Sequence, residues 1–438
     1  MSLMKRLTRQ LVIIPLLLWT ATGSSGSADD LSARNISVIG YPSIQEAIDA
    51  NPGRMLHVPA GDYPITKKLI LRTDRSGLYG PGRIIQQNAE QPIVEIEKAT
   101  GIELAGVTLT RPDGKQETTT EAVLAIHVRD LVLENIRVIN NRTRSAAIAL
   151  RDCTGARISR CFIQNYMRVT IDDRTNDLNW GYAFNCTDGT GISVRTSRGT
   201  LIESNRIVEE NLRPTPEIKA QHKLGEWVKK NPVKGKLLNQ QIWDSGATDN
   251  WQQGSAIIVT SPEASDLTRI LGNHIENAAQ GIDLHSDRVI VSGNIVVNSF
   301  IGMKAMHGSR NILILGNQFV KNTLWSIGLM PGVSSHIRNT DGGSIIANNI
   351  ISDFGHGDAE WVWGSDRAPL RFDHGQEPSD PPLTDVIVQG NLIDSPGEPK
   401  YRYAVIIEGE PNAPRGLHFS NNLFPAGSKG VCNSDLTP

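Results

Sequence analysis

A short unit repeats along this chain, and its period constrains the fold more than any other feature. Two consecutive copies are GIDLHSDRVIVSGNIVV (281–297) and GMKAMHGSRNILILGNQFV (302–320), each of which reads strand, turn, strand and a Gly-Asn step. The Asn of this step is Asn273, Asn294 and Asn317 in three successive units, which gives a period of roughly 20 to 25 residues. Short runs of β-branched and Leu residues at such a period are typical of a solenoid whose coils stack strand on strand. The sequence therefore predicts an all-β fold, a parallel β-helix of about ten coils.

The Asn of the repeat marks one corner of each predicted coil. It recurs along the chain, with one Cys in the same slot, at Asn135, Cys161, Asn205, Asn273, Asn294, Asn317, Asn349, Asn391 and Asn422. An Asn at the same corner of successive coils predicts a ladder of amide hydrogen bonds, and Asn also tolerates the left-handed backbone of a tight turn. We interpret these Asn residues as structural and Cys161 as a buried structural thiol.

Length and charge limit the classes of protein to consider. A repeat array grows by adding coils and escapes the usual domain-size limit, so we expect residues 29–438 to form a single β-helix domain. The formal net charge is −2, which gives no reason to expect a nucleic-acid partner or a polybasic membrane-binding surface.

Four Cys permit three disulfide pairings, and none is required by a solenoid core. The oligomeric state is left open.

The first 28 residues have the pattern of a signal peptide. Lys5, Arg6 and Arg9 precede an apolar run at 11–19, and small residues lead to a cleavage site after Ala28. The apolar run is too short for an ordinary spanning helix, and no other stretch approaches about 20 apolar residues, so no membrane span is expected. Losing three cations changes the net charge from −2 to about −5 (−2 − 3). We expect a secreted or periplasmic protein.

Residues 43–50 read as a helix that covers the open end of the solenoid. Ser43 is a helix-capping residue, Glu46 follows it three positions later as in a capping box, and Ile44, Ala47 and Ile48 have helical spacing. A helix at this end would shield apolar core and unpaired strand edge in the first coil.

The segments SIQEAIDA, VPAGDY and GLYGPG, between Ser43 and Gly82, resemble the opening of the pectin-lyase-like right-handed parallel β-helix proteins. This superfamily includes pectate lyases, polygalacturonases and phage tailspikes. The resemblance implies a right-handed coil, in agreement with the general hand of parallel crossovers, and a polysaccharide or oligosaccharide partner. By family analogy alone it allows a Ca²⁺ role; no calcium-binding position matches, and the residues themselves indicate no cofactor and no metal ligand.

The individual family is not identified by the known motifs. Polygalacturonases carry Asn-Thr-Asp, an Asp pair, Gly-His-Gly and Arg-x-Lys on successive coils. This chain has NTD (339–341) and GHG (355–357), but the two are too close together, the Asp pair is missing and no Arg-x-Lys follows. We attribute these two matches to chance.

Two long spacings between coils predict inserted loops, at about 207–254 and 353–382. Long loops in a compact array are usually functional or disordered, so we expect these insertions to form the walls of a binding cleft. Trp243 and Trp251, in the first insertion, are candidate platforms on which a sugar could stack.

Aligning the strands of successive units assigns side chains to faces. In Gly281-Ile-Asp-Leu-His285 and Gly302-Met-Lys-Ala-Met306 the second and fourth residues are apolar and should point into the core, which leaves the third and fifth outside. Stacked strands lie about 4.8 Å apart, so Asp283 and Lys304 should be neighbours on the outer face. The neutral alternative is a surface ion pair worth about 0 to 1 kcal/mol. The concentration of titratable residues in two coils favours a functional site instead.

The candidate catalytic residues are therefore Asp283, His285, Lys304 and His307. The candidate substrate-binding residues are Asp287, Arg310, Arg195, Trp243, Trp251 and His336.

Three functions fit these residues. In a lyase that cleaves a uronate polysaccharide by β-elimination, Lys304, His285 or His307 would act as base or proton donor while a cation neutralises the substrate carboxylate. In a glycoside hydrolase two carboxyl groups, such as those of Asp283 and Asp287, would stand about 5 to 9.5 Å apart. A non-catalytic carbohydrate-binding β-helix would need only the Trp-bearing loops. We favour the lyase, because cations outnumber carboxylates at the outer positions of a chain whose net charge is negative.

Overall fold

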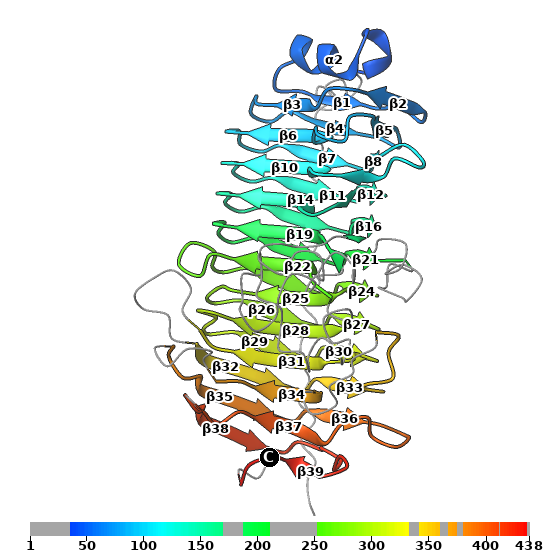
Figure 1. Cartoon of the computed structure of the whole chain (residues 1–438). Helices are drawn as coiled ribbons and strands as arrows, with labels where there is room; N and C mark the ends of the chain where they lie inside the picture. The colour runs from blue at the N-terminus through cyan, green and yellow to red at the C-terminus, as the bar shows by residue number, and fades with distance from the viewer. Residues whose placement is uncertain are drawn as a thin grey trace, which may run out of the picture.

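The structure is a computed structural model that describes residues 36–169, 187–210, 252–332, 341–359, 367–374, 380–410 and 412–435. The predicted signal peptide at 1–28 lies outside these residues. Each coil contributes one short strand to each of three long parallel sheets, named A, B and C in the order in which the chain visits them (Figure 1). The fold is the right-handed parallel β-helix that the repeat predicted. Sheets A and C contain twelve strands each, somewhat more than the expected number of coils.

The strands of each sheet, in spatial order, are as follows. Sheet A contains β1 (Met55–His57), β4 (Gly77–Tyr79), β7 (Glu103–Ala105), β11 (Val132–Glu134), β15 (Arg157–Ser159), β20 (Leu201–Glu203), β23 (Arg269–Leu271), β26 (Ile290–Ser292), β29 (Leu313–Leu315), β32 (Gly342–Ala347), β35 (Thr384–Gln389) and β38 (Arg415–Ser420). Sheet B contains β2 (Asp62–Ile65), β5 (Arg83–Gln86), β8 (Thr108–Thr110), β12 (Arg137–Ile139), β16 (Phe162–Gln164), β21 (Arg206–Val208), β24 (His274–Glu276), β27 (Ile295–Val297), β30 (Gln318–Val320), β33 (Ile350–Ser352) and β36 (Leu392–Asp394). Sheet C contains β3 (Leu69–Leu71), β6 (Val94–Glu97), β10 (Val123–Ile126), β14 (Ala146–Arg151), β19 (Thr190–Arg195), β22 (Ser255–Thr260), β25 (Gln280–Leu284), β28 (Ile301–Met306), β31 (Trp325–Met330), β34 (Ala368–Phe372), β37 (Tyr403–Ile407) and β39 (Gly430–Cys432). Two short pairs lie beside the stack: β9 (Glu117–Thr118) with β13 (Arg142–Thr143), and β17 (Arg168–Val169) with β18 (Thr187–Asp188).

The core is built from aliphatic residues that occupy the same position in successive coils. In sheet C, Ile192, Ile257, Ile282, Met303 and Ile327 are in register with one another and are all buried. Because strand side chains alternate between faces, the residues on either side of these positions point outward. The alternation predicted from the sequence is thereby confirmed, and the outer face of sheet C is left free for polar residues.

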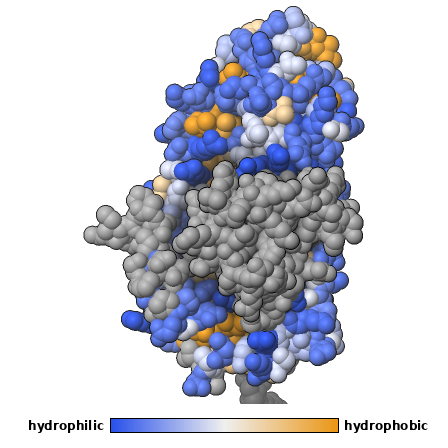
Figure 2. Space-filling view, in the orientation of Figure 1, coloured by the Kyte–Doolittle hydropathy of each residue, from blue (hydrophilic) through white to orange (hydrophobic). Residues whose placement is uncertain are grey.

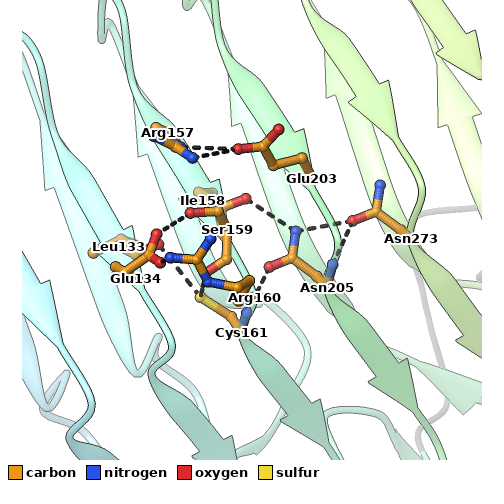
Figure 3. A network of polar contacts seen from close by, with 10 residues as sticks. All are labelled: Leu133, Glu134, Arg157, Ile158, Ser159, Arg160, Cys161, Glu203, Asn205 and Asn273. Atoms are coloured by element: carbon orange, nitrogen blue, oxygen red, sulfur yellow. Dashed lines mark hydrogen bonds and ion pairs between the residues drawn. The ribbon is translucent and has the colours of Figure 1, made fainter. Parts of the chain in front are cut away.

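The predicted Asn ladder is present along most of the stack. Six consecutive links run through Asn205, Asn273, Asn294, Asn317, Asn349, Asn391 and Asn422, and in each link the amide Nδ2 of one Asn donates to the Oδ1 of the next at 2.9 or 3.0 Å. Cys161 begins the ladder, since its backbone N–H donates to the Oδ1 of Asn205 (Figure 3). Burial raises the pKa of the Cys161 thiol to about 12, which confirms a structural thiol.

Asn135 does not belong to this ladder, contrary to the sequence prediction. The register pairs Arg137 with Phe162, so Ile136 occupies the slot of Cys161 and Asn135 lies one residue earlier. Asn135 has a φ of 52°, and the residues directly before the ladder Asn, such as Gly293 (φ 66°) and Gly316 (φ 60°), share this left-handed conformation. The Gly-Asn step therefore combines a left-handed turn residue with an amide rung.

We predict that Asn294→Ala lowers the free energy of unfolding by about 3 kcal/mol, because it leaves buried donors of Asn273 without an acceptor. Asn422→Ala is the matched control. It is the last rung and only partly buried, so water can replace its bonds and we expect a loss of about 1 kcal/mol. Denaturant unfolding of both variants measures the difference. Equal losses of unfolding free energy would show that an Asn in the middle of the ladder does not stabilise the fold more than the last Asn.

The predicted terminal helix is α2 (Ile44–Ala50), which follows a short 3₁₀ turn, η1 (Val38–Gly40). The Ser43 half of the capping box is present: the hydroxyl Oγ of Ser43 accepts from the backbone N–H of Glu46, and the Glu46 carboxylate accepts from the same hydroxyl, both at 3.2 Å. The Gln45 side chain accepts from the backbone N–H of Ile70 at 2.8 Å. The helix thus covers the end of the stack (Figure 1) and occupies a backbone group of edge strand β3.

The structure describes little of the first predicted insertion, and it shows that the second is not a single loop. Most of 207–254 lies outside the described residues. The range 353–382 is not one loop, because it contains β34 (Ala368–Phe372), a full member of sheet C. That these segments form the walls of a cleft, and that residues 29–438 make one domain, stay predictions.

The surface that the described residues present in the view of Figure 2 is mainly hydrophilic, with a few separate hydrophobic patches. Among the described residues, no helix is both long and apolar enough to cross a membrane. Cys153, Cys161 and Cys432 are free thiols.

Candidate active site

The candidate site lies on the outer face of sheet C, across strands β25, β28, β31 and β34. One outer position reads Ile258, Asp283, Lys304, Gly328 and Arg371 in consecutive strands, in register throughout. Neighbouring strands lie about 4.8 Å apart, so the fold brings three charged residues from distant parts of the sequence into one row.

Asp283 is the centre of this row and is almost fully buried, with 3% of its surface exposed. Its Oδ2 lies 3.4 Å from the Nζ of Lys304, its Oδ1 lies 3.1 Å from the Nε2 of His285, and the Ser255 hydroxyl donates to Oδ2 at 3.5 Å. Burial by itself would raise the pKa of Asp283, but the charges of Lys304 and His285 outweigh it and lower the pKa to about 2. The carboxylate is therefore charged at neutral pH.

Lys304 is 7% exposed, so this pair is not the solvated surface ion pair that the sequence left as an alternative. The predicted neighbours Asp283 and Lys304 are in contact, and His285 joins them from the end of β25. Three of the four candidate catalytic residues thus form one cluster, in which the Asp283–Lys304 ion pair is buried and His285 is partly exposed.

His307 completes the group from the turn after β28. Its ring lies edge-on to the ring of His285, with centroids 5.7 Å apart and an interplanar angle of 86°. Burial lowers the pKa of His307, and the positive charges of His285 and Lys304 lower it further, against smaller opposite effects from Asp380 and Asp283. The lowered pKa favours the neutral imidazole at His307, which lies against the His285 ring and within the field of the Lys304 charge.

Sequence reasoning missed a second group that borders the first. The guanidinium of Arg371 lies 5.2 Å above the ring of Trp325, and it pairs with Asp373 and Glu408, each at 3.2 Å. Trp325 packs over Gly328, where a Cβ would come within 3.2 Å of the ring carbon Cε3. Extending the strand alignment by one coil finds Trp325, whereas Arg371 and Asp373 fall within the range 353–382, which the sequence predicts to be an inserted loop.

The candidate binding residues are more scattered. Asp287 lies in the turn after β25, where it pairs with Arg288 and accepts from Asn311, both at 2.8 Å. Arg310 is exposed, and its backbone forms a parallel β-bridge with Asp287 of the preceding coil. Arg195 is exposed on β19, two strands or about 10 Å from β25 on the same sheet. Trp243, Trp251 and His336 lie outside the described residues.

The site does not fit the calcium role allowed by family analogy. Within the parts of the chain that the structure describes, no group of three or more His, Cys, Asp or Glu residues is arranged to hold a metal. Ca²⁺ takes six to eight oxygen ligands, whereas the Asp283 carboxylate is engaged by a lysine and a histidine.

No protein-family model matches this chain, and no curated protein sequence matches it either. Solved structures match over 91% of the chain. The Dettilon tailspike protein (gp208) has a TM-score of 0.58 at 13% identity, with 66% of its chain covered. The alginate lyase AlyF-OU02, solved with G6, has a TM-score of 0.54 at 11% identity, with 87% covered. The catalytic unit of a thermostable GH87 alpha-1,3-glucanase from Streptomyces thermodiastaticus has a TM-score of 0.54 at 11% identity, with 70% covered. The chain therefore shares the right-handed parallel β-helix fold of these proteins.

Proposed function

We propose that this protein is a carbohydrate-active enzyme, and more specifically a lyase that cleaves an acidic, uronate-containing polysaccharide by β-elimination at the cluster of Asp283, His285, Lys304 and His307. The observation that carries the proposal is one cluster in which the His307 ring lies against His285, and His285 and Lys304 both contact Asp283; the lowered pKa of His307 suits it to act as a base, and this reaction requires a base and a cation together. An alginate lyase and a GH87 glucanase share the fold, which supports carbohydrate chemistry without selecting the reaction.

In the proposed reaction, Lys304 neutralises the carboxylate of the uronate in the cleaved bond. This makes the proton on C5 more acidic, and neutral His307 accepts it. The electrons of the C5–H bond form a C4=C5 double bond as the C4–O4 bond to the leaving sugar breaks. His285, the second imidazole of the cluster, stands where it could return a proton to O4.

Asp283 holds this arrangement together. Its negative charge compensates the positive charge of the buried Lys304 ammonium, and its other oxygen gives the His285 ring a fixed partner. Because the carboxylate divides its interactions between two partners, Lys304 keeps attraction for a substrate carboxylate. We also propose that the enzyme is exported, on the basis of the predicted signal peptide.

A panel of anionic and neutral polysaccharides tests the function. The purified chain is incubated with each polymer, and both the ultraviolet absorbance of unsaturated uronates and the release of reducing ends are followed. A lyase gives both signals on a uronate polymer. Reducing ends without the absorbance would identify a glycoside hydrolase, and binding without either signal would identify a non-catalytic carbohydrate-binding protein; either result contradicts the lyase.

The pH dependence of the reaction should report His307. It accepts a proton only when neutral, and its pKa is lowered from the ordinary 6.5. The free enzyme should therefore gain kcat/KM as the pH rises through a midpoint below 6.5, and the same midpoint should appear in an NMR titration of the His307 ring. A midpoint in kcat/KM that does not follow the ring titration would assign the base to another residue.

A further inference from the structure

A buried carboxylate next to the candidate site has no role in the chemistry proposed above. Asp341, directly before β32, is 2% exposed. Its Oδ1 accepts from the backbone N–H groups of Gly308 and Ser309 at 3.0 and 3.1 Å, and its Oδ2 accepts from those of Gly308 and Gly332 at 3.0 and 3.3 Å. The carboxylate thus joins two segments of backbone, the turn after β28 and the segment after β31. Converging backbone N–H groups form a site suited to an anion.

Both of these segments touch His307. Gly308 follows it directly, and the pair has the unusual φ values of 37° for His307 and 90° for Gly308. A non-glycine residue rarely adopts a positive φ unless its surroundings hold it there. On the other side, Gly332 lies against the imidazole, because a Cβ at Gly332 would come within 2.6 Å of the ring carbon Cδ2 and 2.9 Å of Nε2. Asp341 therefore ties together the backbone that bends under His307 and the backbone that packs against its ring.

We propose that Asp341 is a positioning residue that fixes the His307 imidazole in the orientation needed to accept a proton. The role of this positioning in catalysis rests on the proposed function. The positioning of the His307 ring by Asp341 does not depend on that function. A base must be held within hydrogen-bond reach of the proton that it removes, and a displacement of about 1 Å can cost about 100-fold in rate.

The chemistry of the contact explains why a carboxylate occupies this position. Three backbone N–H groups converge on it, and one of them, that of Gly308, contacts both oxygens. An Asn at this position would offer a single acceptor oxygen and would turn its own N–H₂ group toward a backbone donor. Burial raises the pKa of Asp341 to about 6, although the three backbone donors and the nearby His285 favour the charged form. Burying a carboxylate costs free energy of desolvation. The simplest reason for a carboxylate at this position is that its two oxygens hold both backbone segments.

The test is Asp341→Asn in the full chain, with NMR of ring-labelled histidine as the main readout. His307→Gln assigns the His307 signal by its loss. We expect Asp341→Asn to shift or broaden the His307 ring signal, and to lower kcat by about 10- to 100-fold while KM changes less than about threefold. Thermal unfolding establishes that the variant is folded under the conditions of the assay.

Glu209→Gln is the matched control. Glu209 is also a buried carboxylate that accepts from backbone N–H groups, those of Tyr166 and Met167, and it pairs with Arg142. Its replacement removes a comparable contact outside the candidate site, so it should leave the His307 signal and kcat unchanged.

Asp341→Glu provides a second test if Asp341→Asn does not fold. It keeps both carboxylate oxygens but displaces them by one methylene from the backbone N–H groups of Gly308, Ser309 and Gly332, so the His307 signal should move. An unmoved His307 signal in Asp341→Asn or, where that variant does not fold, in Asp341→Glu overturns the inference whatever the activity. A moved signal in a chain that cleaves no polysaccharide would leave the positioning intact and refute the proposed function instead.

Discussion

Replacing Lys304 by Ala should lower kcat/KM on a uronate polysaccharide by about 1,000-fold, and replacing His307 by Ala should have an effect of similar size. Removing one preorganised electrostatic partner typically lowers the reaction rate about 100- to 1,000-fold, and removing a general base lowers it about 100- to 10,000-fold. Because both residues act on the same proton transfer, the loss of kcat/KM in the double variant should be little greater than the loss in the less active of the two single variants. Initial rates from the absorbance of the unsaturated product measure all three.

Lys68→Ala is the matched control for this prediction. Lys68 pairs with Glu95 at 2.6 Å, and Glu95 occupies the outer position of sheet C that Asp283 occupies five strands further on. The control thus removes a lysine from a more exposed lysine–carboxylate pair at the same sheet, far from the cluster. If Lys304→Ala and His307→Ala keep full activity while Asp283→Asn abolishes it, the lyase assignment is wrong and a glycoside hydrolase takes its place.

The coil architecture and the pairing of Asp283 with Lys304 followed from the sequence because both depend on a simple period. Units of similar length fix the register, and once Ile282 and Met303 are assigned to the core, the intervening residues must point outward. Burial of the pair was not predictable in this way. Whether an outer position is solvated depends on what lies over it, and the repeat contains no information about that.

The failures occurred where the repeat becomes irregular. The ladder residues Asn317 and Asn349 are 32 positions apart and Asn349 and Asn391 are 42 apart, so no alignment by length could locate β34 or its Arg371. Asn135 was misassigned by one position because the ladder slot of its coil holds Ile136. Asp341 belongs to the Asn-Thr-Asp match that the sequence analysis attributes to chance; its position under His307 was not predictable, because its partners are backbone N–H groups, which every residue type except proline carries.

Replacing Asp283 by Leu should destabilise the protein by about 3 to 5 kcal/mol, because it leaves the Lys304 ammonium buried without its partner. The pKa of Asp283 is lowered to about 2, so its carboxylate contributes stability above the ordinary pKa of 3.8, and this contribution is lost as the pH falls toward 2. The difference in unfolding free energy between wild type and Asp283→Leu should therefore shrink in acid. Urea unfolding at neutral pH and near pH 3 measures both quantities.

The double variant Asp283→Leu with Lys304→Met separates a stabilising pair from one that is retained for function. Replacing both partners of a buried ion pair by apolar residues of similar volume is often neutral or stabilising, by about 1 to 4 kcal/mol, because neither charge then has to be desolvated. We expect the double variant to recover most of the stability lost in Asp283→Leu and to be inactive on every polymer. Glu95→Leu, in the more exposed pair with Lys68, should cost about 1 kcal/mol or less. A double variant as unstable as Asp283→Leu would mean that the pair is there to hold the coils together, and the argument that its charges are kept for catalysis would lose its physical basis.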